Sequence, residues 1–523
     1  MIWFVTSRDQ SVAPVFSNLE RTEAIMRVKR AAITGLLAVL LVISLVAAVI
    51  LMRTVSAGYD IPDTEHISYT DIPQEDAVQR LSHALQFRTI STQDNREQYR
   101  HEFDAFIDFM RDSYPLIHEE LELEIVNNYT ILFKWEGSRP NLSAAMMQGH
   151  YDVVPVEPGT FEDWSYPPFE GTIADGFVWG RGAIDDKSGI MSYMEAISYL
   201  LERGFQPERT VYIALNHDEE VGGRQGARKV ADLMLKREID IAFLTDEGMP
   251  IAEKILEGLE HPIAMIGVAE KGYISLELEV NKEGGHSSMP PRETTIGALS
   301  AAITNLKQQP MEGRFAGLIR ETFQPLLPDL PFIYRMGLSN LWLFGGVIEE
   351  RLGYIPHTNA ALRTTIAPTM FHAGIKENIL PQTAQTIINF RIHPNDSVRE
   401  VLYYVQETID NEKIEVRVLE GAREPSSVSS TSSLAYLDMK QTIHEIFPDI
   451  PVAPAMFLAA TDSRHFTEVT DNLLRFRPIR ARPDDRGRIH GTNERIGIDN
   501  YVEMIAFYIR LIENTTTGLQ ATI

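Results

Sequence analysis

Acidic side chains and histidines directly follow three short apolar runs of this chain. His150 and Asp152 come after the first run, Glu219 and Glu220 after the second, and Asp246 after the third. One acidic strand end usually only caps the next helix. Three are harder to explain in that way, because the carboxyl ends of parallel strands gather ligand-binding side chains at one edge of an α/β sheet. Imidazole and carboxylate groups bind divalent metals, so this pattern predicts a metal site.

A fourth acidic position lies in the segment Trp179-Gly180-Arg181-Gly182-Ala183-Ile184-Asp185-Asp186-Lys187-Ser188. The glycines allow a tight turn that aims Asp185 inward, just before a helix that Ser188 is predicted to cap. Because a carboxylate has two oxygens, Asp185 could bridge two cations about 3.5–4 Å apart. The local sequence supports a second interpretation equally well, in which Asp185 and Asp186 only stabilise the helix N-terminus with negative charge.

The composition restricts this chemistry. The 523 residues contain no cysteine, which excludes disulfides, thiolate ligands and a cysteine nucleophile. Any transition metal must then be held by His, Asp and Glu. The formal net charge of -25 argues against a nucleic-acid partner, because binding phosphates requires a basic face.

The elements that must position these residues alternate between strand and helix. Apolar runs at 131–134, 143–147, 211–215 and 241–244 predict buried strands, and helices are predicted at 77–85, 99–111, 188–201 and 226–235. The end of the chain returns to helix at 433–447, strand at 452–457 and helix at 500–513. This alternation predicts an α/β catalytic domain built on a doubly wound mixed sheet.

A second region interrupts this domain. Strands at 274–280 and 386–391 and helices at 296–308 and 398–411 predict an inserted α/β sandwich, which acts as a lid domain over 271–424. The catalytic domain would then consist of two parts, residues 74–270 and 425–523. The segment 311–373, rich in Phe, Leu and Pro, is a long insertion in the lid that the simple pattern does not explain.

Residues 31–52 form an uncharged run that is long enough to cross a bilayer as one transmembrane helix. Basic residues precede it, and acidic residues follow after Arg53. The positive-inside bias places residues 1–30 in the cytoplasm and makes 53–73 a linker to an extracytoplasmic catalytic domain. We therefore predict a membrane-bound signal-anchor protein. The alternative is secretion after signal cleavage, because Val55-Ser56-Ala57 resembles a cleavage site.

Four motifs, GHYDVVP, GRGAIDDKSG, NHDEEVGG and TDEG, occur in this order and resemble a family of di-zinc amidohydrolases. That family includes bacterial glutamate carboxypeptidase, aminoacylase and yeast carboxypeptidase S. The later motif HGTNER resembles the last ligand motif of the family, and GGHSS resembles its lid-domain histidine motif. The resemblance covers residues 75 to 515 and implies a metallohydrolase with two Zn²⁺ per chain.

The resemblance implies five metal ligands, one of them shared: His150, Asp185 and Asp246 for one zinc, and Asp185, Glu220 and His490 for the other. Asp152 would fix the tautomer of His150. Glu219 would be the general base that takes a proton from a water between the metals. The resemblance also implies a cis peptide between Asp185 and Asp186.

Further positions match substrate contacts of the family. His286 would stabilise the tetrahedral oxyanion, in some relatives from a neighbouring subunit, which implies a homodimer through the lid domain. The alternative is that His286 is only a polar turn residue. Asn378 and Arg391 match contacts to the substrate carboxylate and the oxyanion, and Arg464 is a second candidate for the carboxylate. Each of these three could equally be a surface or interdomain contact.

Two segments of the insertion, Ser339–Phe344 and Arg363–Phe371, resemble the carboxypeptidase S branch of the family. That branch includes a secreted animal enzyme that makes and breaks N-fatty-acyl amino acids. The expected substrate is a small molecule or peptide with a free carboxylate, cut at a C-terminal peptide bond or an N-acyl bond. The apolar side chains of the insertion would line an acyl pocket or form the core of an enlarged lid: Phe332, Leu341, Trp342, Leu343 and Phe344.

Two other functions compete with this one. A di-zinc aminopeptidase would use a similar centre but would recognise a free amine. A degenerate homologue acting as a receptor or adhesion ectodomain should have lost ligands or the base, whereas all the key positions are of the required type.

Overall fold

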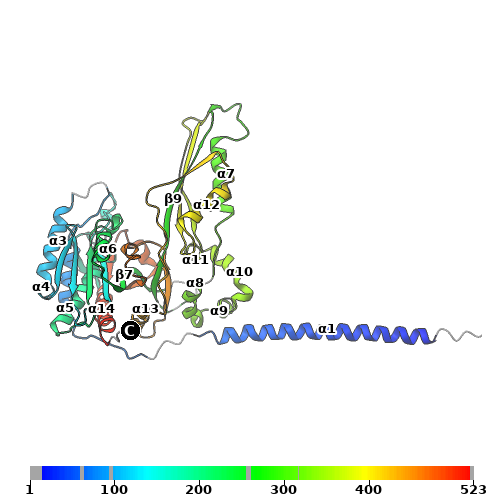
Figure 1. Cartoon of the computed structure of the whole chain (residues 1–523), viewed down its shortest axis with the longest axis horizontal. Helices are drawn as coiled ribbons and strands as arrows, with labels where there is room; N and C mark the ends of the chain where they lie inside the picture. The colour runs from blue at the N-terminus through cyan, green and yellow to red at the C-terminus, as the bar shows by residue number, and fades with distance from the viewer. Residues whose placement is uncertain are drawn as a thin grey trace, which may run out of the picture.

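The computed structural model describes residues 15–58, 64–93, 98–254, 259, 261–315 and 317–518. An eight-stranded mixed sheet forms the frame of the catalytic domain, in the order β1-β2-β6-β3-β7-β16-β8-β15 (Figure 1). Its strands are β1 Glu122–Val126, β2 Thr130–Trp135, β3 Ala144–His150, β6 Val211–Asn216, β7 Ile241–Ala252, β8 Ile263–Glu270, β15 Val452–Phe457 and β16 Leu473–Ala481. Strands β6, β3, β7 and β16 are mutually parallel. The predicted mixed α/β sheet is confirmed.

Helices cover both faces of this sheet, which is why its central strands are apolar throughout. Side chains alternate between two cores along each strand, so Met147 packs on one face and Met146 on the other. The first core is closed by α2 Gln74–Ala84, α3 Arg100–Ser113, α4 Pro115–Glu120, α5 Lys187–Glu202, α13 Leu434–Ile446 and α14 Ile498–Thr516. The second is closed by α6 Ala227–Lys236.

Two local predictions are wrong. Helix α5 begins at Lys187, so Ser188 lies inside the helix and is not its N-cap. Asp186 precedes the helix, and its carboxylate binds Arg477 instead of the helix N-terminus. Strand β7 does not end at residue 244 but continues to Ala252, because β16 and β8 pair with it over this extra length.

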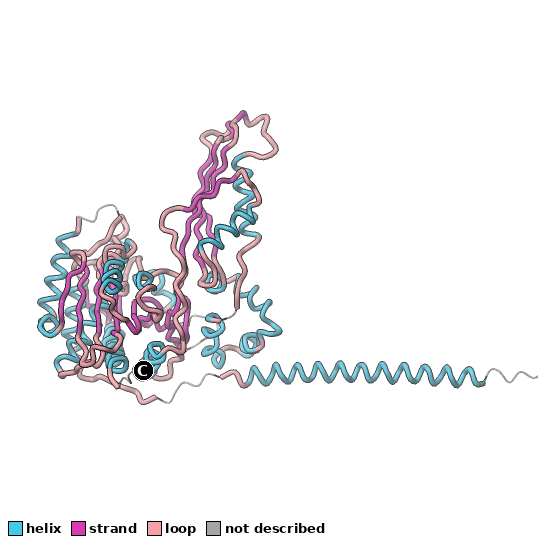
Figure 2. The backbone as a smooth tube through the Cα atoms, viewed as in Figure 1, coloured by secondary structure: helices cyan, strands magenta, loops and turns pink. Residues whose placement is uncertain are grey.

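The lid domain is a four-stranded antiparallel sheet with helices on one face (Figure 2). Its order is β11-β13-β9-β14, formed by β9 Gly272–Asn281, β11 Thr365–Ala373, β13 Thr383–Ile392 and β14 Ile414–Val418. Helices α7 Thr295–Gln308 and α12 Val398–Ile409 pack on it through a separate core that includes Leu278, Leu299 and Val401. A capping box of Ser397 and Glu400 begins α12.

The two chain segments that connect the domains are held tightly together. A Cβ on Gly272 would lie 2.6 Å from the backbone nitrogen of Pro425, so only glycine lets the outgoing and returning segments approach this closely. Just before Gly272, Glu270 accepts hydrogen bonds from the backbone and hydroxyl of Thr461 and lies 2.9 Å from the guanidinium of Arg475. Both partners of this ion pair are buried, which fixes the base of the lid to the catalytic sheet.

The insertion contains α8 Leu318–Phe323, the 3₁₀ helix η3 Gln324–Asp329, α9 Phe332–Ser339, α10 Leu341–Gly353 and α11 Pro356–Leu362. Its first part packs on the edge of the catalytic sheet, where Leu326 and Leu330 contact residues of β8 and β15. The helices of the insertion therefore lie outside the lid core, whereas its last part forms β11 at the edge of the lid sheet. Phe332, Trp342 and Leu343 are exposed, so they line no closed acyl pocket here.

The N-terminal helix α1 Val15–Val55 projects from the folded body (Figure 1). Its segment Arg21–Val55 contains an 18-residue stretch with a mean hydropathy of 3.0 and is long and apolar enough to cross a membrane, a description that a signal sequence also meets. Of the predicted cytoplasmic residues, 1–14 lie outside the described part of the chain.

Candidate metal centre

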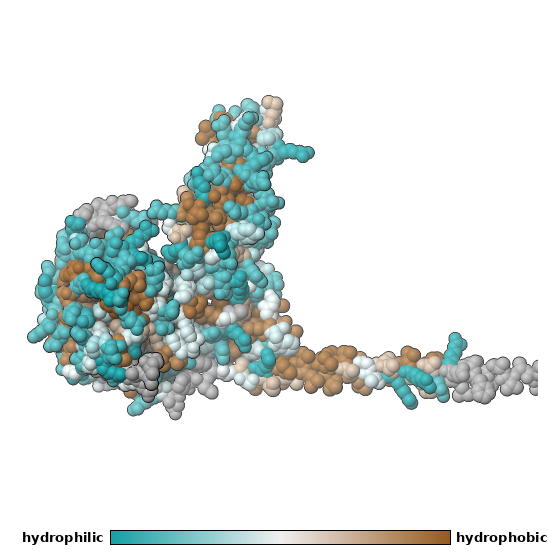
Figure 3. All heavy atoms as spheres, viewed as in Figure 1, coloured by the Kyte–Doolittle hydropathy of each residue, from teal (hydrophilic) through white to brown (hydrophobic). Residues whose placement is uncertain are grey.

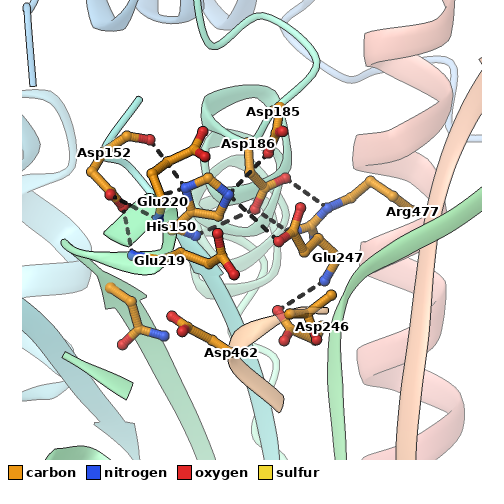
Figure 4. A network of polar contacts seen from close by, with 12 residues as sticks. His150, Asp152, Asp185, Asp186, Glu219, Glu220, Asp246, Glu247, Asp462 and Arg477 are labelled. Atoms are coloured by element: carbon orange, nitrogen blue, oxygen red, sulfur yellow. Dashed lines mark hydrogen bonds and ion pairs between the residues drawn. The ribbon is translucent and has the colours of Figure 1, made fainter. Parts of the chain in front are cut away.

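The site lies where β3 and β6 end side by side. His150 is the last residue of β3 and pairs in register with Asn216, the last residue of β6. Glu219 and Glu220 follow in the 3₁₀ turn η2 Glu219–Val221. The expectation that these strand ends meet at one edge of the sheet is therefore confirmed by the topology, and Figure 4 shows the side chains converging.

Asp185 lies between two imidazoles. Its Oδ1 is 3.0 Å from Nε2 of His150, and its Oδ2 is 3.1 Å from Nε2 of His490. Nε2 of His490 is also 3.2 Å from Oε2 of Glu220. One carboxylate thus faces two separate groups of nitrogen and oxygen ligands, which is the arrangement a bridging ligand requires. The Asp185–Asp186 peptide is cis, as the resemblance implied.

Two buried ion pairs hold the Asp185 loop. Glu494 accepts hydrogen bonds from the backbone of Ile184 and Asp185 and pairs with Arg181, whose guanidinium also donates to the carbonyl of His490. Strand β17 Arg495–Gly497 pairs with β5 Phe177–Trp179 beside this contact. The Asp185 loop and the His490 loop, which are far apart in the sequence, are therefore held together next to the site.

On the other side of the loop, Arg477 binds Asp186 through two nitrogens and contacts the hydroxyls of Tyr193 and Tyr508. The carboxylate of Asp186 is therefore already neutralised by a fixed cation. It also lies close to His150, whose backbone nitrogen donates to it. From these contacts we infer that Asp186 helps to position His150 and the Asp185 loop.

Asp152 is fully buried and organises the two strand ends. Its carboxylate accepts hydrogen bonds from the backbone nitrogens of Glu219 and Glu220, at 3.1 and 3.2 Å. Nδ1 of His150 lies 3.0 Å from the carbonyl of Asp152 and 3.4 Å from its Oδ1. Such contacts fix the imidazole so that Nε2 faces Asp185, the orientation that a ligand histidine needs.

The electrostatics of the cluster suit bound cations. Burial raises the pKa of Glu219 to about 8 and also raises the pKa values of Glu220 and Glu247. Hydrogen bonds to Asp185 and Glu220 raise the pKa of His490 to about 10. Oε1 of Glu220 is buried without a hydrogen-bond partner among the described residues. Carboxylates buried this close together need positive charge, and the donor set fits divalent metals.

The third strand brings Glu247, and not Asp246, to this cluster. Oε1 of Glu247 lies 3.5 Å from Nε2 of His150. Asp246 instead accepts hydrogen bonds from Gln148 and from the backbone of Ser463. Because β7 continues through both residues, their side chains point to opposite sides of the strand. Glu247 was missed in the sequence, and this alternation is the signal that would have indicated it.

The two lid-tip residues lie apart from the cluster. His286 is exposed on the short strand β10 Gly285–His286, which pairs with β12 Ile379–Leu380. The carbonyl of Asn378 accepts a hydrogen bond from the backbone nitrogen of Ser287, so Asn378 lies beside His286 at the far end of the lid. The structure does not bring either residue to Asp185 within one chain.

The two candidate arginines occupy different places. Arg464 lies beside the cluster, with Nη1 3.4 Å from Oε1 of Glu219. Arg391, in β13 at the base of the lid, lies over the ring of Tyr273 at 5.1 Å. Asp462 next to Arg464 was not singled out from the sequence. It is buried, neither carboxylate oxygen has a hydrogen-bond partner in the described chain, and burial raises its pKa.

Known proteins resemble the chain over nearly its whole length. A family model described as Peptidase family M20/M25/M40 matches residues 146–514. The N-fatty-acyl-amino acid synthase/hydrolase of Xenopus tropicalis is 38% identical over 507 residues, covering 94% of this chain and 97% of the relative. A probable carboxypeptidase S-like protein of Dictyostelium discoideum is 39% identical over 464 residues, covering 87% of this chain and 88% of the relative. A metallo-carboxypeptidase structure from Sulfolobus solfataricus has a TM-score of 0.59 at 19% identity, covering 84% of this chain and 98% of that chain.

The contrast between Glu247 and Asp246 gives a direct test. We expect Glu247→Gln to lower the metal content by one ion per chain, because it weakens a ligand beside His150. Asp246→Asn should keep both ions, since its contacts are hydrogen bonds to Gln148 and Ser463. Metal analysis after dialysis measures this, with Glu253→Gln as a control just beyond the end of β7, where Glu253 pairs with Arg482. Metal loss only in Asp246→Asn would contradict the assignment of Glu247.

Proposed function

The chain belongs to the peptidase family M20/M25/M40 and is a metallohydrolase, and we propose that it cleaves an amide bond next to a free carboxylate. The substrate would be an N-acyl amino acid or a peptide with a C-terminal carboxylate. The observation that carries this proposal is the position of Asp185 between two imidazoles, with Glu219 next to the same cluster. The names of the Xenopus and Dictyostelium relatives agree with amide hydrolysis.

We propose two Zn²⁺ as the native metals. On the contacts above, the ligands of the first would be His150, Asp185 and Glu247, and those of the second Asp185, Glu220 and His490. When bound, such a pair of cations polarises the scissile carbonyl and lowers the pKa of a water molecule between them.

Glu219 is proposed as the general base. Its backbone is fixed by Asp152, while its carboxylate faces Arg464 and takes no part in the contacts of His150 and His490. It can therefore take a proton from the attacking water and give it to the nitrogen of the leaving amine. Arg464 would bind the substrate carboxylate, because a guanidinium can hold both oxygens at once. Arg391 and Asn378 stay as candidates for the same role or for the oxyanion, since both belong to the lid.

The carboxylate requirement separates this function from an aminopeptidase. We expect an N-acyl amino acid to be hydrolysed with a kcat/KM about 10- to 100-fold higher than its carboxamide, which loses charge-assisted hydrogen bonds to an arginine. The comparison includes a dipeptide with a free amine and its N-acetylated form. A preference for the free amine would favour the aminopeptidase alternative and would exclude the proposed carboxylate contact. No turnover with two metals bound would favour a receptor or adhesion role.

A second prediction concerns the base. Glu219→Gln should lower kcat by about 10²- to 10⁴-fold, because the variant cannot accept the proton. Its metal content should not change, since Glu220 and not Glu219 contacts His490. The control variant Glu253→Gln, which changes a half-buried residue paired with Arg482, should keep full activity. If Glu219→Gln retained its rate with both metals bound, the base would have to be another group.

We also propose that two chains form a homodimer through their lid domains, with His286 of one chain completing the site of the other. The support is the exposed position of His286 at the lid tip, and the exposed strand β11 at the edge of the lid sheet. An exposed edge strand is available for pairing with a second sheet.

Complementation tests this arrangement. His286→Ala and Glu219→Gln should each be nearly inactive alone, because each lacks one catalytic group. Mixed dimers of the two variants should regain activity, since one of their two sites combines an intact Glu219 with an intact His286. Activity is measured after co-expression and is compared with a physical mixture of the separate dimers. Absence of recovery in verified mixed dimers would show that His286 does not act across subunits.

For its location, we propose that α1 stays uncleaved as a single membrane anchor with a cytoplasmic N-terminus. The support is its length and hydropathy, together with the basic residues before the apolar run and the acidic residues after it.

A further inference from the structure

The insertion presents an apolar surface to solvent. None of the described residues of α9 and α10 is buried, although most of them are apolar. We call these two helices, residues 332–353, the insert hairpin. Its exposed large apolar side chains are Phe332, Ile333, Tyr334, Trp342, Leu343 and Val347. Trp342 is 55% exposed and Val347 60%, whereas large apolar side chains of this kind are usually buried.

The insert hairpin is attached to the end of α1. Asn340 lies between α9 and α10, and its amide donates to Oγ1 of Thr54 at 3.2 Å and to the carbonyl of Ile50 at 3.3 Å. Both Asn340 and Thr54 are fully buried by this contact. Thr54 lies just after the apolar run 31–52, so the contact is at the level where that run ends.

The position of this contact determines where the insert hairpin lies relative to a membrane that α1 would cross. In Figure 1, α9 and α10 lie beside the C-terminal end of α1, on the side of the folded body from which α1 projects. In Figure 3, apolar surface of the insertion lies next to the apolar surface of α1. A bilayer around residues 31–52 would therefore meet the insert hairpin at its surface.

The residue types fit that depth. Tyr334, Trp342 and Tyr354 are exposed aromatic residues with a polar end, the kind that concentrates at the boundary between headgroups and acyl chains. A cleft of about 340 Å³ between α1 and the insertion is lined by Arg53 and Arg320 together with apolar side chains. Cations next to apolar surface are also typical of the headgroup level.

We propose that the insert hairpin docks into the leaflet at the C-terminal end of α1, so that the chain has a second, monotopic contact with the membrane. The proposal rests on α1 being the anchor. The continuity between this surface and the α1 contact favours the bilayer over a second copy of the chain or another protein. Because α8 and η3 pack on the edge of the catalytic sheet, docking would hold the catalytic domain in one orientation above the membrane.

The absence of cysteine allows a sharp test. Single variants Leu343→Cys and Val347→Cys of the full chain are labelled with an environment-sensitive fluorophore and reconstituted into phosphatidylcholine vesicles. We expect blue-shifted emission and quenching by lipids that carry a quencher at a shallow depth. Ile375→Cys is the matched control, because Ile375 is 93% exposed at the lid tip. A fluorophore at this position should show the emission of an aqueous environment. Leu41→Cys, in the middle of α1, should be quenched by a deep quencher.

The outcomes separate the two proposals. A water-like, unquenched signal at 343 and 347 with deep quenching at Leu41 would overturn the docking and leave the anchor in place. Absence of quenching at Leu41 would overturn the anchor and, with it, the docking. If the emission at position 343 is blue-shifted but lipid quenchers do not reduce its intensity, the surface contacts protein and not lipid. This result would also overturn the proposal.

Discussion

The structure depends on one carboxylate, Asp185, which shares its two oxygens between the imidazoles of His150 and His490. His150 comes from the end of a central strand and His490 from a loop near the end of the chain. A single side chain must therefore hold two distant parts of the sequence at hydrogen-bonding distance. Most polar groups around it serve this purpose, including the pair of Arg181 and Glu494 and the pair of Arg477 and Asp186.

The same constraint explains why the site is rich in buried acid. Asp152, Asp185, Glu219, Glu220 and Glu247 lie together, and burial or mutual repulsion raises the pKa of several of them. Such a cluster would be unfavourable in an apoprotein without compensating cations. The fixed cations Arg477 and Arg464 lie at its edges, and the imidazoles of His150 and His490 lie next to Asp185 at its centre. The charge distribution therefore fits a centre that is completed by metals.

The sequence predicted much of the catalytic frame, because its strands are apolar runs that end at polar residues. The ends of β3 and β6 were recognised in this way, and with them His150, Glu219 and Glu220. The end of β7 was not, since its length is set by pairing with β16, a strand far away in the chain. The sequence therefore drew attention to Asp246, whereas Glu247 is the residue of β7 that lies beside His150 in the structure. The helices of the insertion were also not placed from the sequence, because no local pattern shows that Leu326 and Leu330 pack on the edge of the catalytic sheet and not in the lid.

The strand order has a consequence for biosynthesis. β16 lies between β7 and β8 in the sheet, but the ribosome makes it only after the entire lid. Until then the sheet lacks a central strand, Asp186 lacks Arg477 and Asp185 lacks His490. A nascent chain can complete the lid as a unit while the catalytic domain is still open. A fragment that ends before β16 would contain neither Arg477 nor His490, so the proposed metal centre can form only after the last part of the chain has been made.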